Sequence, residues 1–171
     1  MLLSYFNDMA TLLSFDTSTK KTGCSVFTDG KYTKSFVIDK SDMKDTKERM
    51  EEMVADAKKV IEFYHPDIVV WETTVVLRNA EAQRNLTMIL GAIWGECISN
   101  NIFYCSLRPT EWRKAVSTGE KIPRKREELK QWGKDKVKEL FGIEVENDDE
   151  SDSILIGQAY INLYSLEYLD V

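Results

Sequence analysis

Four carboxylates stand at positions where an α/β protein gathers ligands. Asp16 follows the apolar run TLLSF, and Glu72 follows the apolar run IVVW. Asp149 and Asp152 are three residues apart at the expected start of the last helix, so both side chains project from one face. Open α/β sheets bind ligands at the ends of buried strands and at helix N-termini. We therefore expect these four acids, which are distant in sequence, to meet in space.

The chemistry of such a cluster is that of a metal-dependent nuclease. Neighbouring carboxylates repel one another and titrate abnormally unless a cation neutralises them. Their hard oxygen atoms suit Mg²⁺ or Mn²⁺. Two such ions, about 3.5–4 Å apart, activate water and stabilise the leaving oxygen in phosphodiester hydrolysis. The pattern therefore predicts two divalent cations held by Asp16, Glu72, Asp149 and Asp152, with carboxyl groups about 4–8 Å apart.

Each acid also has a purely structural interpretation. Asp16 would form the Asp-Thr-Ser turn through bonds to the backbone. Glu72 would be a surface carboxylate at a strand end, and Asp149 and Asp152 would cap a helix. For any one residue this interpretation is at least as good as the catalytic one. The occurrence of all four acids at two strand ends and one helix start favours the catalytic site.

The elements that would position these acids follow from hydrophobic periodicity and turn residues. Strands are predicted over 11–16, 23–28, 32–38, 67–72 and 102–105, and Asp29-Gly30 predicts a hairpin. Helices are predicted from a cap at Ser41 or Asp42 to Tyr64, and over 80–99, 109–116, 124–141 and 151 to about 168. This order predicts one α/β domain over residues 1–171, in which a mixed five-stranded sheet (three antiparallel N-terminal strands plus parallel strands) is flanked by helices. Residues 1–9 are expected to form an N-terminal extension.

Composition limits the class of protein. The chain has 171 residues, of which 43% are hydrophobic and 30% charged, as in a compact globular domain. No apolar run is long enough to span a bilayer, and the N-terminus lacks a secretion signal. Three cysteines (Cys24, Cys97 and Cys105) without CxxC spacing predict reduced thiols, not disulfides or a zinc site. We expect a cytoplasmic protein with no membrane contact.

Positive charge is concentrated in one stretch of an acidic chain. The net charge is −6, but residues 108–139 carry 11 basic and 6 acidic residues, a net +5. Charge alone favours a solvated helix with i,i+4 ion pairs over a phosphate-binding surface. Trp112 and Trp132 would either pack in the core, which is the favoured interpretation, or stack on splayed bases. Our candidates for contacts with a DNA backbone are Arg78, Lys121, Lys125 and Lys130.

Four segments, taken in order, resemble motifs of the RuvC-type Holliday junction resolvases of the ribonuclease H-like superfamily, with a phage branch as one candidate. They are LSFDTSTKKTG (13–23); DIVVWE (67–72) followed by Arg78-Asn79-Ala80 and Gly91; RPTEWRKAV (108–116); and DESDSI (149–154). The resemblance covers about residues 11–164. It implies a ribonuclease H-like fold and a homodimeric, Mg²⁺-dependent endonuclease that cuts four-way DNA junctions symmetrically and leaves 5′-phosphate ends. It also implies that Asp16, Glu72, Asp149 and Asp152 are the metal ligands.

The sequence departs from the family pattern in places. Val75 stands where relatives usually carry a bulky side chain, Ser153 stands where they carry alanine, and the basic loop around 119–126 is longer, so no single catalytic lysine is assigned. One alternative is a ribonuclease H-like module that binds DNA or protein without cutting. Another is a partner protein in tRNA threonylcarbamoyladenosine synthesis, because Phe15–Thr19 also resembles the first strand of the sugar kinase/Hsp70-like fold. The absence of a second glycine-rich motif argues against that alternative and against a nucleotide cofactor. Forks or flaps are other conceivable substrates.

Overall fold

The computed structural model describes residues 10–74 and 79–164. Its strands are β1 (Thr11–Asp16), β2 (Lys21–Thr28), β3 (Lys31–Asp39), β4 (Ile68–Glu72) and β5 (Phe103–Leu107). Its helices are α1 (Thr46–Tyr64), α2 (Ala80–Ser99), α3 (Pro109–Val116), α4 (Arg126–Phe141) and α5 (Asp148–Tyr164). The order of these elements is the one predicted from the sequence. No helix in the described ranges has the length and hydrophobicity needed to cross a membrane.

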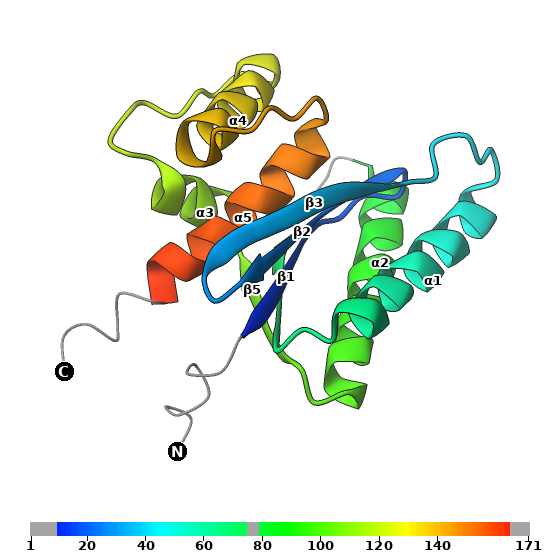
Figure 1. Cartoon of the computed structure of the whole chain (residues 1–171). Helices are drawn as coiled ribbons and strands as arrows, with labels where there is room; N and C mark the ends of the chain where they lie inside the picture. Colours follow the sequence, from blue (N-terminus) through cyan, green and yellow to red (C-terminus); the bar gives the residue numbers. More distant parts are fainter. Residues whose placement is uncertain (1–9, 75–78, 165–171) are drawn as a thin grey trace.

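The five strands form one mixed sheet in the order β3-β2-β1-β4-β5. β1 pairs with β2, and β2 with β3, in antiparallel fashion, whereas β1 pairs with β4, and β4 with β5, in parallel. Helices α1 and α2 cover one face, and α3, α4 and α5 lie on the other (Figure 1). The prediction of a mixed five-stranded α/β sheet, antiparallel at its N-terminal strands, parallel at the others and flanked by helices, is confirmed.

The hydrophobic core has one half on each face of the sheet. Leu13 and Phe15 pack with residues of α1 and α2, whereas Leu12, on the opposite face, packs with residues of α3 and α5. Successive side chains of a strand point to opposite faces, so one short strand serves both halves. β4 behaves in the same way, since Ile68 through Trp71 are all buried. A nearly continuous apolar strand is therefore what a central parallel strand needs here.

Helix α5 lies unusually close to the sheet. A Cβ atom added to Gly157 would lie 2.4 Å from Phe27 Cε2 and 2.8 Å from Ser14 Oγ, so only glycine fits. The hydroxyls of Ser14 and Ser25 lie 2.7 and 3.0 Å from the carbonyl oxygen of Ser153 on α5. Small residues on the helix and buried hydroxyls on the strands thus allow the helix to approach and satisfy its polar backbone. This contact fixes the position of the N-terminal turn of α5.

Several predicted boundaries were wrong by a few residues. α1 is capped by Asp45, whose side chain accepts from Glu48 N at 2.9 Å, and not by Ser41 or Asp42. α4 begins at Arg126 and not at residue 124, because Lys125 has an extended backbone and is the N-cap. α5 begins at Asp148 and not at residue 151. Strands β2, β3, β4 and β5 are each displaced or extended by one or two residues, which is the usual uncertainty of element ends. Residues 1–9, the expected extension, and 165–168, the expected helix end, lie outside the described residues.

Candidate functional site

Two of the four acids end neighbouring parallel strands. Phe15 of β1 is registered with Trp71 of β4, so Asp16 and Glu72 follow at the same level on adjacent strands. Parallel neighbours lie about 4.8 Å apart, and their carboxyl ends meet at one edge of the sheet. The fold therefore brings together two residues that are 56 positions apart in the sequence.

The other two acids reach this edge on the first turn of α5. Gly23 is the cross-strand partner of Asp16, and a Cβ atom on Gly23 would lie 1.8 Å from the carbonyl oxygen of Asp149. Only glycine permits this approach of helix to strand. Asn147, not an aspartate, caps the helix, because its Oδ1 accepts from the backbone N–H groups of Asp149 and Glu150 at 2.8 and 3.2 Å. The helix therefore needs neither Asp149 nor Asp152 as its cap.

The titration behaviour of these carboxyl groups reflects their burial first, and for Asp16 and Asp152 also the other acids of the set. Burial, followed by the negative charges of Asp152, Glu72 and Asp149, raises the pKa of Asp16 well above its usual value. Burial raises the pKa of Asp152 to about 7, and burial together with nearby negative charge raises that of Asp149 to about 6. Burial also raises the pKa of Glu72. Like charges held together in a partly desolvated place oppose ionisation in this way.

The turn after Asp16 is built by other residues. Ser18 Oγ accepts from the N–H of Lys21 at 3.0 Å and donates to the carbonyl oxygen of Lys21 at 2.7 Å. Thr22 Oγ1 donates to Ser18 O at 3.1 Å, and Arg49 Nε of α1 donates to Thr19 O at 3.0 Å. The hydrogen bonds of this turn come from Ser18, Thr22 and Arg49. Asp16 is therefore not needed to form the turn.

Glu72 is held by two residues that sequence reasoning did not assign to the site. Trp112 Nε1 donates to Glu72 Oε2 at 2.6 Å, and Arg113 Nη2 lies 3.9 Å from the same oxygen. The positive charge of Arg113 lowers the pKa of Asp16, Asp152 and Glu72, against the larger effect of burial. Motif 108–116 was the only signal for these two residues, and nothing in the sequence indicates which side chain they contact.

The candidate DNA-contacting lysines differ in how strongly they are engaged. Lys121 is exposed, and Lys125, whose side chain is 82% exposed, pairs with Glu128 at 3.1 Å. Lys130 pairs with Asp148 at 2.9 Å, one residue before Asp149. Ion pairs of this kind on α4 agree with the solvated-helix interpretation, while the exposed cations remain accessible. Arg78, and Val75 of the family comparison, lie outside the described residues.

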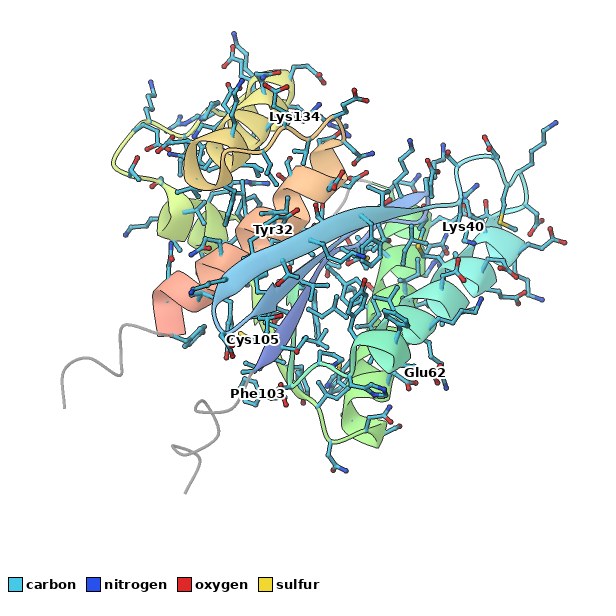
Figure 2. All side chains as sticks on the ribbon, viewed as in Figure 1. Tyr32, Lys40, Glu62, Phe103, Cys105 and Lys134 are labelled. Carbon is cyan, nitrogen blue, oxygen red and sulfur yellow. The ribbon has the colours of Figure 1, made fainter. Side chains whose placement is uncertain are left out.

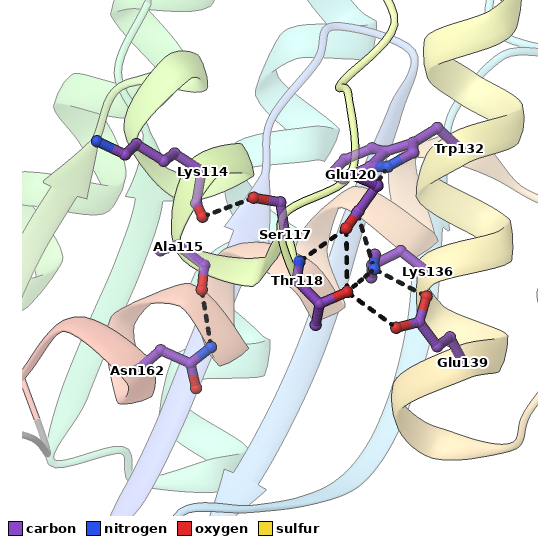
Figure 3. Close-up of polar contacts among 9 residues, drawn as sticks. All are labelled: Lys114, Ala115, Ser117, Thr118, Glu120, Trp132, Lys136, Glu139 and Asn162. Carbon is purple, nitrogen blue, oxygen red and sulfur yellow. Dashed lines mark hydrogen bonds and ion pairs between the residues drawn. The ribbon is translucent and has the colours of Figure 1, made fainter.

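A polar network fixes the loop between α3 and α4 (Figure 3). Lys136, which is 2% exposed, lies 2.8 Å from both Glu120 Oε1 and Glu139 Oε2 and donates to Thr118 Oγ1 at 3.3 Å. Trp132 Nε1 donates to Glu120 Oε1 at 3.2 Å. Trp112 is fully buried and Trp132 partly buried in the core on the α5 face, so the packing interpretation of both tryptophans is confirmed. This network holds the loop that carries Lys121.

Among residues 10–74 and 79–164, no three His, Cys, Asp or Glu side chains are arranged closely enough to hold a metal ion. The chemistry of the donors nevertheless fits a hard divalent cation. Asp16, Glu72, Asp149 and Asp152 are all carboxylates, and each is kept from ionising readily by burial. A cation that neutralises them would remove this penalty.

Comparison with solved structures defines the class of fold. RuvC of Thermus thermophilus in complex with a Holliday junction substrate matches with a TM-score of 0.72 and 15% identity over 92% of this chain and 96% of that one. Another structure of Thermus thermophilus RuvC matches with a TM-score of 0.71 and 17% identity over the same shares. The yeast mitochondrial Holliday junction resolvase Ydc2 matches with a TM-score of 0.63 and 15% identity over 94% of this chain and 82% of that one. No protein-family model and no curated protein sequence matches.

The fold is therefore of the RuvC type, and the resemblance drawn from four sequence motifs is confirmed at the level of structure. These likenesses extend over nearly the whole chain.

Proposed function

We propose that this protein is a divalent-metal-dependent endonuclease that cleaves branched DNA, with the four-way junction as its main substrate. The observation that carries the proposal is the convergence of Asp16, Glu72, Asp149 and Asp152 at one edge of a RuvC-type sheet. The Thermus thermophilus relative in complex with a Holliday junction substrate supports the choice of DNA. In this proposal the chain is a single nuclease domain. Its free cysteines agree with a cytoplasmic location.

The four carboxylates would hold Mg²⁺ or Mn²⁺, with two ions in each site. When bound, such ions would polarise the phosphate, activate water for attack on phosphorus and stabilise the departing 3′ oxygen, so the phosphate would stay on the 5′ end. The chain itself supplies the donors and fixes their positions. Trp112 orients Glu72, and α5 carries Asp149 and Asp152 against the strand next to Asp16.

Lys121, Lys125 and Lys130 would contact the DNA backbone. Lys130 is tied to Asp148 at the start of α5, which places it beside the acids. Lys121 and Lys125 both precede the start of α4. They lie on the loop that the Lys136 network holds in place (Figure 3). Contacts of this kind position DNA without reading its sequence. Arg78 belongs to the same proposal on sequence grounds alone.

A homodimer would supply two sites related by a two-fold axis, as symmetrical cleavage requires. Support comes from large apolar side chains exposed on α2 and on the edge strand β5. Trp94 and Ile98, four residues apart on one side of α2, are 48% and 54% exposed, and Met88 of the same helix is 65% exposed. Phe103 and Tyr104 of β5 are 55% and 39% exposed. Figure 2 shows Phe103 at the opposite end of the molecule from Lys134 of α4, well away from the basic helix. An apolar surface of this kind is typical of a protein interface.

Metal-dependent nicking of a synthetic four-way junction tests the activity, with a linear duplex of the same sequence as the substrate control. We expect cleavage in Mg²⁺ or Mn²⁺ that Asp16→Asn and Glu72→Gln abolish while binding of the junction persists. Asp135→Asn and Glu144→Gln make the same chemical changes at exposed positions of α4 and of the following loop, and should cleave normally. Binding of the junction without cleavage in either metal would instead favour the non-catalytic module, and activity on flaps or forks alone would change the substrate.

Light scattering after gel filtration tests the dimer. We expect Trp94→Glu to give a monomer, because it places a charge in the proposed interface. Phe63→Glu is the matched control, since Phe63 is an apolar residue of α1 that is 76% exposed elsewhere on the surface. A monomeric wild-type chain at micromolar concentration would rule out this interface.

A further inference from the structure

The contact between Trp112 and Glu72 is short and enclosed. Trp112 is fully buried on α3, and its Nε1 lies 2.6 Å from Glu72 Oε2. An indole N–H only donates, so the bond can only support the carboxylate as an acceptor. Hydrogen bonds to an ionised acceptor are shorter and about twice as strong as neutral ones. The geometry is therefore that of a fixed support for one oxygen of Glu72.

Arg113 reinforces the same side of the carboxylate. Its guanidinium carbon lies 4.6 Å from the centroid of the Trp112 ring, and its Nη2 lies 3.9 Å from Glu72 Oε2. Both of these contacts are made to Oε2, so this is the oxygen of Glu72 that α3 holds.

Helix α3 is itself tied to the helix that carries the other acids. Trp112 lies in the same core cluster as Ile154 and Leu155 of α5. Asn162 of α5 donates from Nδ2 to the carbonyl oxygen of Ala115 on α3 at 2.9 Å (Figure 3). Through Trp112, the end of strand β4 is therefore coupled to the rigid pair of helices that also positions Asp149 and Asp152.

We infer that Trp112 is a positioning residue for the reaction: its indole N–H fixes Oε2 of Glu72 and so holds the carboxylate in the orientation in which it would bind a cation. The inference rests on the proposed function. Trp112 touches neither substrate nor metal in this role and acts only through Glu72. Partners of metal-ligating groups typically affect metal affinity or activity by about 10–100-fold.

The chain contains its own matched control. Trp132 also donates from Nε1 to a carboxylate, that of Glu120 at 3.2 Å, but this pair belongs to the loop between α3 and α4. The experiment compares Trp112→Phe with Trp132→Phe, since each retains an aromatic ring and loses the N–H. Measurements are kcat and KM on a four-way junction, Mn²⁺ affinity by calorimetry without DNA, and Tm. Trp112→Met, which also lacks a donor and adapts to irregular spaces in a core, is the second variant should Trp112→Phe fold poorly.

For folded Trp112→Phe we expect kcat to fall and Mn²⁺ affinity to weaken by about 10–100-fold each, with KM for DNA unchanged. Trp132→Phe should retain Mn²⁺ affinity within about twofold, because its partner Glu120 lies outside the set of four acids. A variant at Trp112 that keeps both values of the wild-type protein overturns the inference and leaves the proposed function standing. A wild-type protein that neither binds Mn²⁺ nor cleaves branched DNA refutes the proposed function itself, so the two failures are distinguishable.

Discussion

Two charged clusters lie partly on helices that cover the same face of the sheet. In one cluster the negative charges are paired with a cation, and in the other they are not. In the network around Lys136, a buried cation contacts Glu120 and Glu139, and its hydrogen bond lowers the pKa of Glu120 to about 2. At the edge of the sheet, Asp16 and Asp152 lie among other acids, and the pKa of Asp152 is raised to about 7. Arg113 is the nearby cation, and it does not offset burial and mutual repulsion.

The difference shows which charges serve the fold and which weaken it. A buried charge that is paired and hydrogen-bonded is tolerated, whereas an uncompensated one costs stability. Proteins retain such costs at functional sites, where perturbed pKa values cluster. The Lys136 network therefore has a structural role, and the acid cluster is the part of the molecule that gains from a ligand of opposite charge.

The largest contrast is expected from Asp152→Asn. In the metal-free protein this variant should raise Tm by about 2–4 °C, the shift that ~1 kcal/mol produces in a domain of this size, because a buried negative charge is removed. Cleavage of a four-way junction should fall by about 10³-fold or more, since several kcal/mol of metal-dependent stabilisation is lost. Calorimetry and a nicking assay measure the two effects. An unchanged cleavage rate would remove Asp152 from the site.

The next effect concerns the close packing that brings α5 to the acids. Gly157→Ala should destabilise the fold by about 3 kcal/mol, because the new Cβ would overlap Phe27 and Ser14, both fully buried. Gly95→Ala, in α2, meets nothing within 4 Å and should stabilise by up to about 1 kcal/mol. Urea unfolding of both variants measures the difference, and equal stabilities would contradict the close approach of α5.

Lys136→Met tests the network around Lys136, in which a buried cation is paired with two carboxylates. Loss of the buried cation leaves Glu120 and Glu139 without their partner, and we expect a destabilisation of about 2 kcal/mol. Lys138→Met is the control, because Lys138 is exposed and pairs with the exposed Glu144, where such substitutions cost less than about 0.5 kcal/mol. Chemical denaturation is the measurement. If both variants were equally stable, the network would not hold the loop.

A smaller effect is expected from pH. Since the folded pKa values of Asp149 and Asp152, about 6 and about 7, exceed their ordinary value of 3.8, the folded state binds protons more tightly than the unfolded state. Stability is lost as pH rises through these values, so the metal-free protein should melt a few degrees higher at pH 5.5 than at pH 8. The rise in Tm on adding Mn²⁺ should be larger at pH 8, because metal competes with protons for the carboxylates. Scanning fluorimetry at both pH values measures this, and a metal-induced rise that is larger at pH 5.5 would contradict it.

The smallest effect is expected at the exposed cations. Lys125→Gln should weaken binding of junction and duplex alike by a few-fold and lower the slope of log affinity against log salt concentration by about 1. Lys59→Gln removes another exposed cation, on α1 (70% against 82% for Lys125), and should leave the slope unchanged. Fluorescence anisotropy at several salt concentrations is the measurement. Equal slopes for the two variants would exclude Lys125 from the DNA surface.

Local patterns were sufficient for most of the secondary structure and for the choice of acids. The apolar runs ending in Asp16 and Glu72 predicted two central strands, and Asp29-Gly30 predicted the hairpin, which forms with positive φ at both residues. Gly142 follows α4 as its C-cap and adopts a left-handed conformation, which glycine adopts readily. Helix starts were less accurate, because several polar residues competed as caps before α1 and α5. Asp45 and Asn147 are the caps, because their side chains accept hydrogen bonds from backbone N–H groups of the first turn. Which polar residue does so depends on the local path of the chain.

By itself, the sequence determined the order of the elements and the fold type and singled out four acids as the candidate site, because periodicity, turn residues and motif order are local properties of the chain. Only the tertiary structure decided what surrounds those acids. Glu72 contacts Trp112 and Arg113, which lie some 40 residues further along the chain. Gly23 packs against Asp149, which is near the other end of the sequence. Contacts between distant segments, and the burial that shifts each pKa, arise from packing and are not encoded in any one stretch of residues.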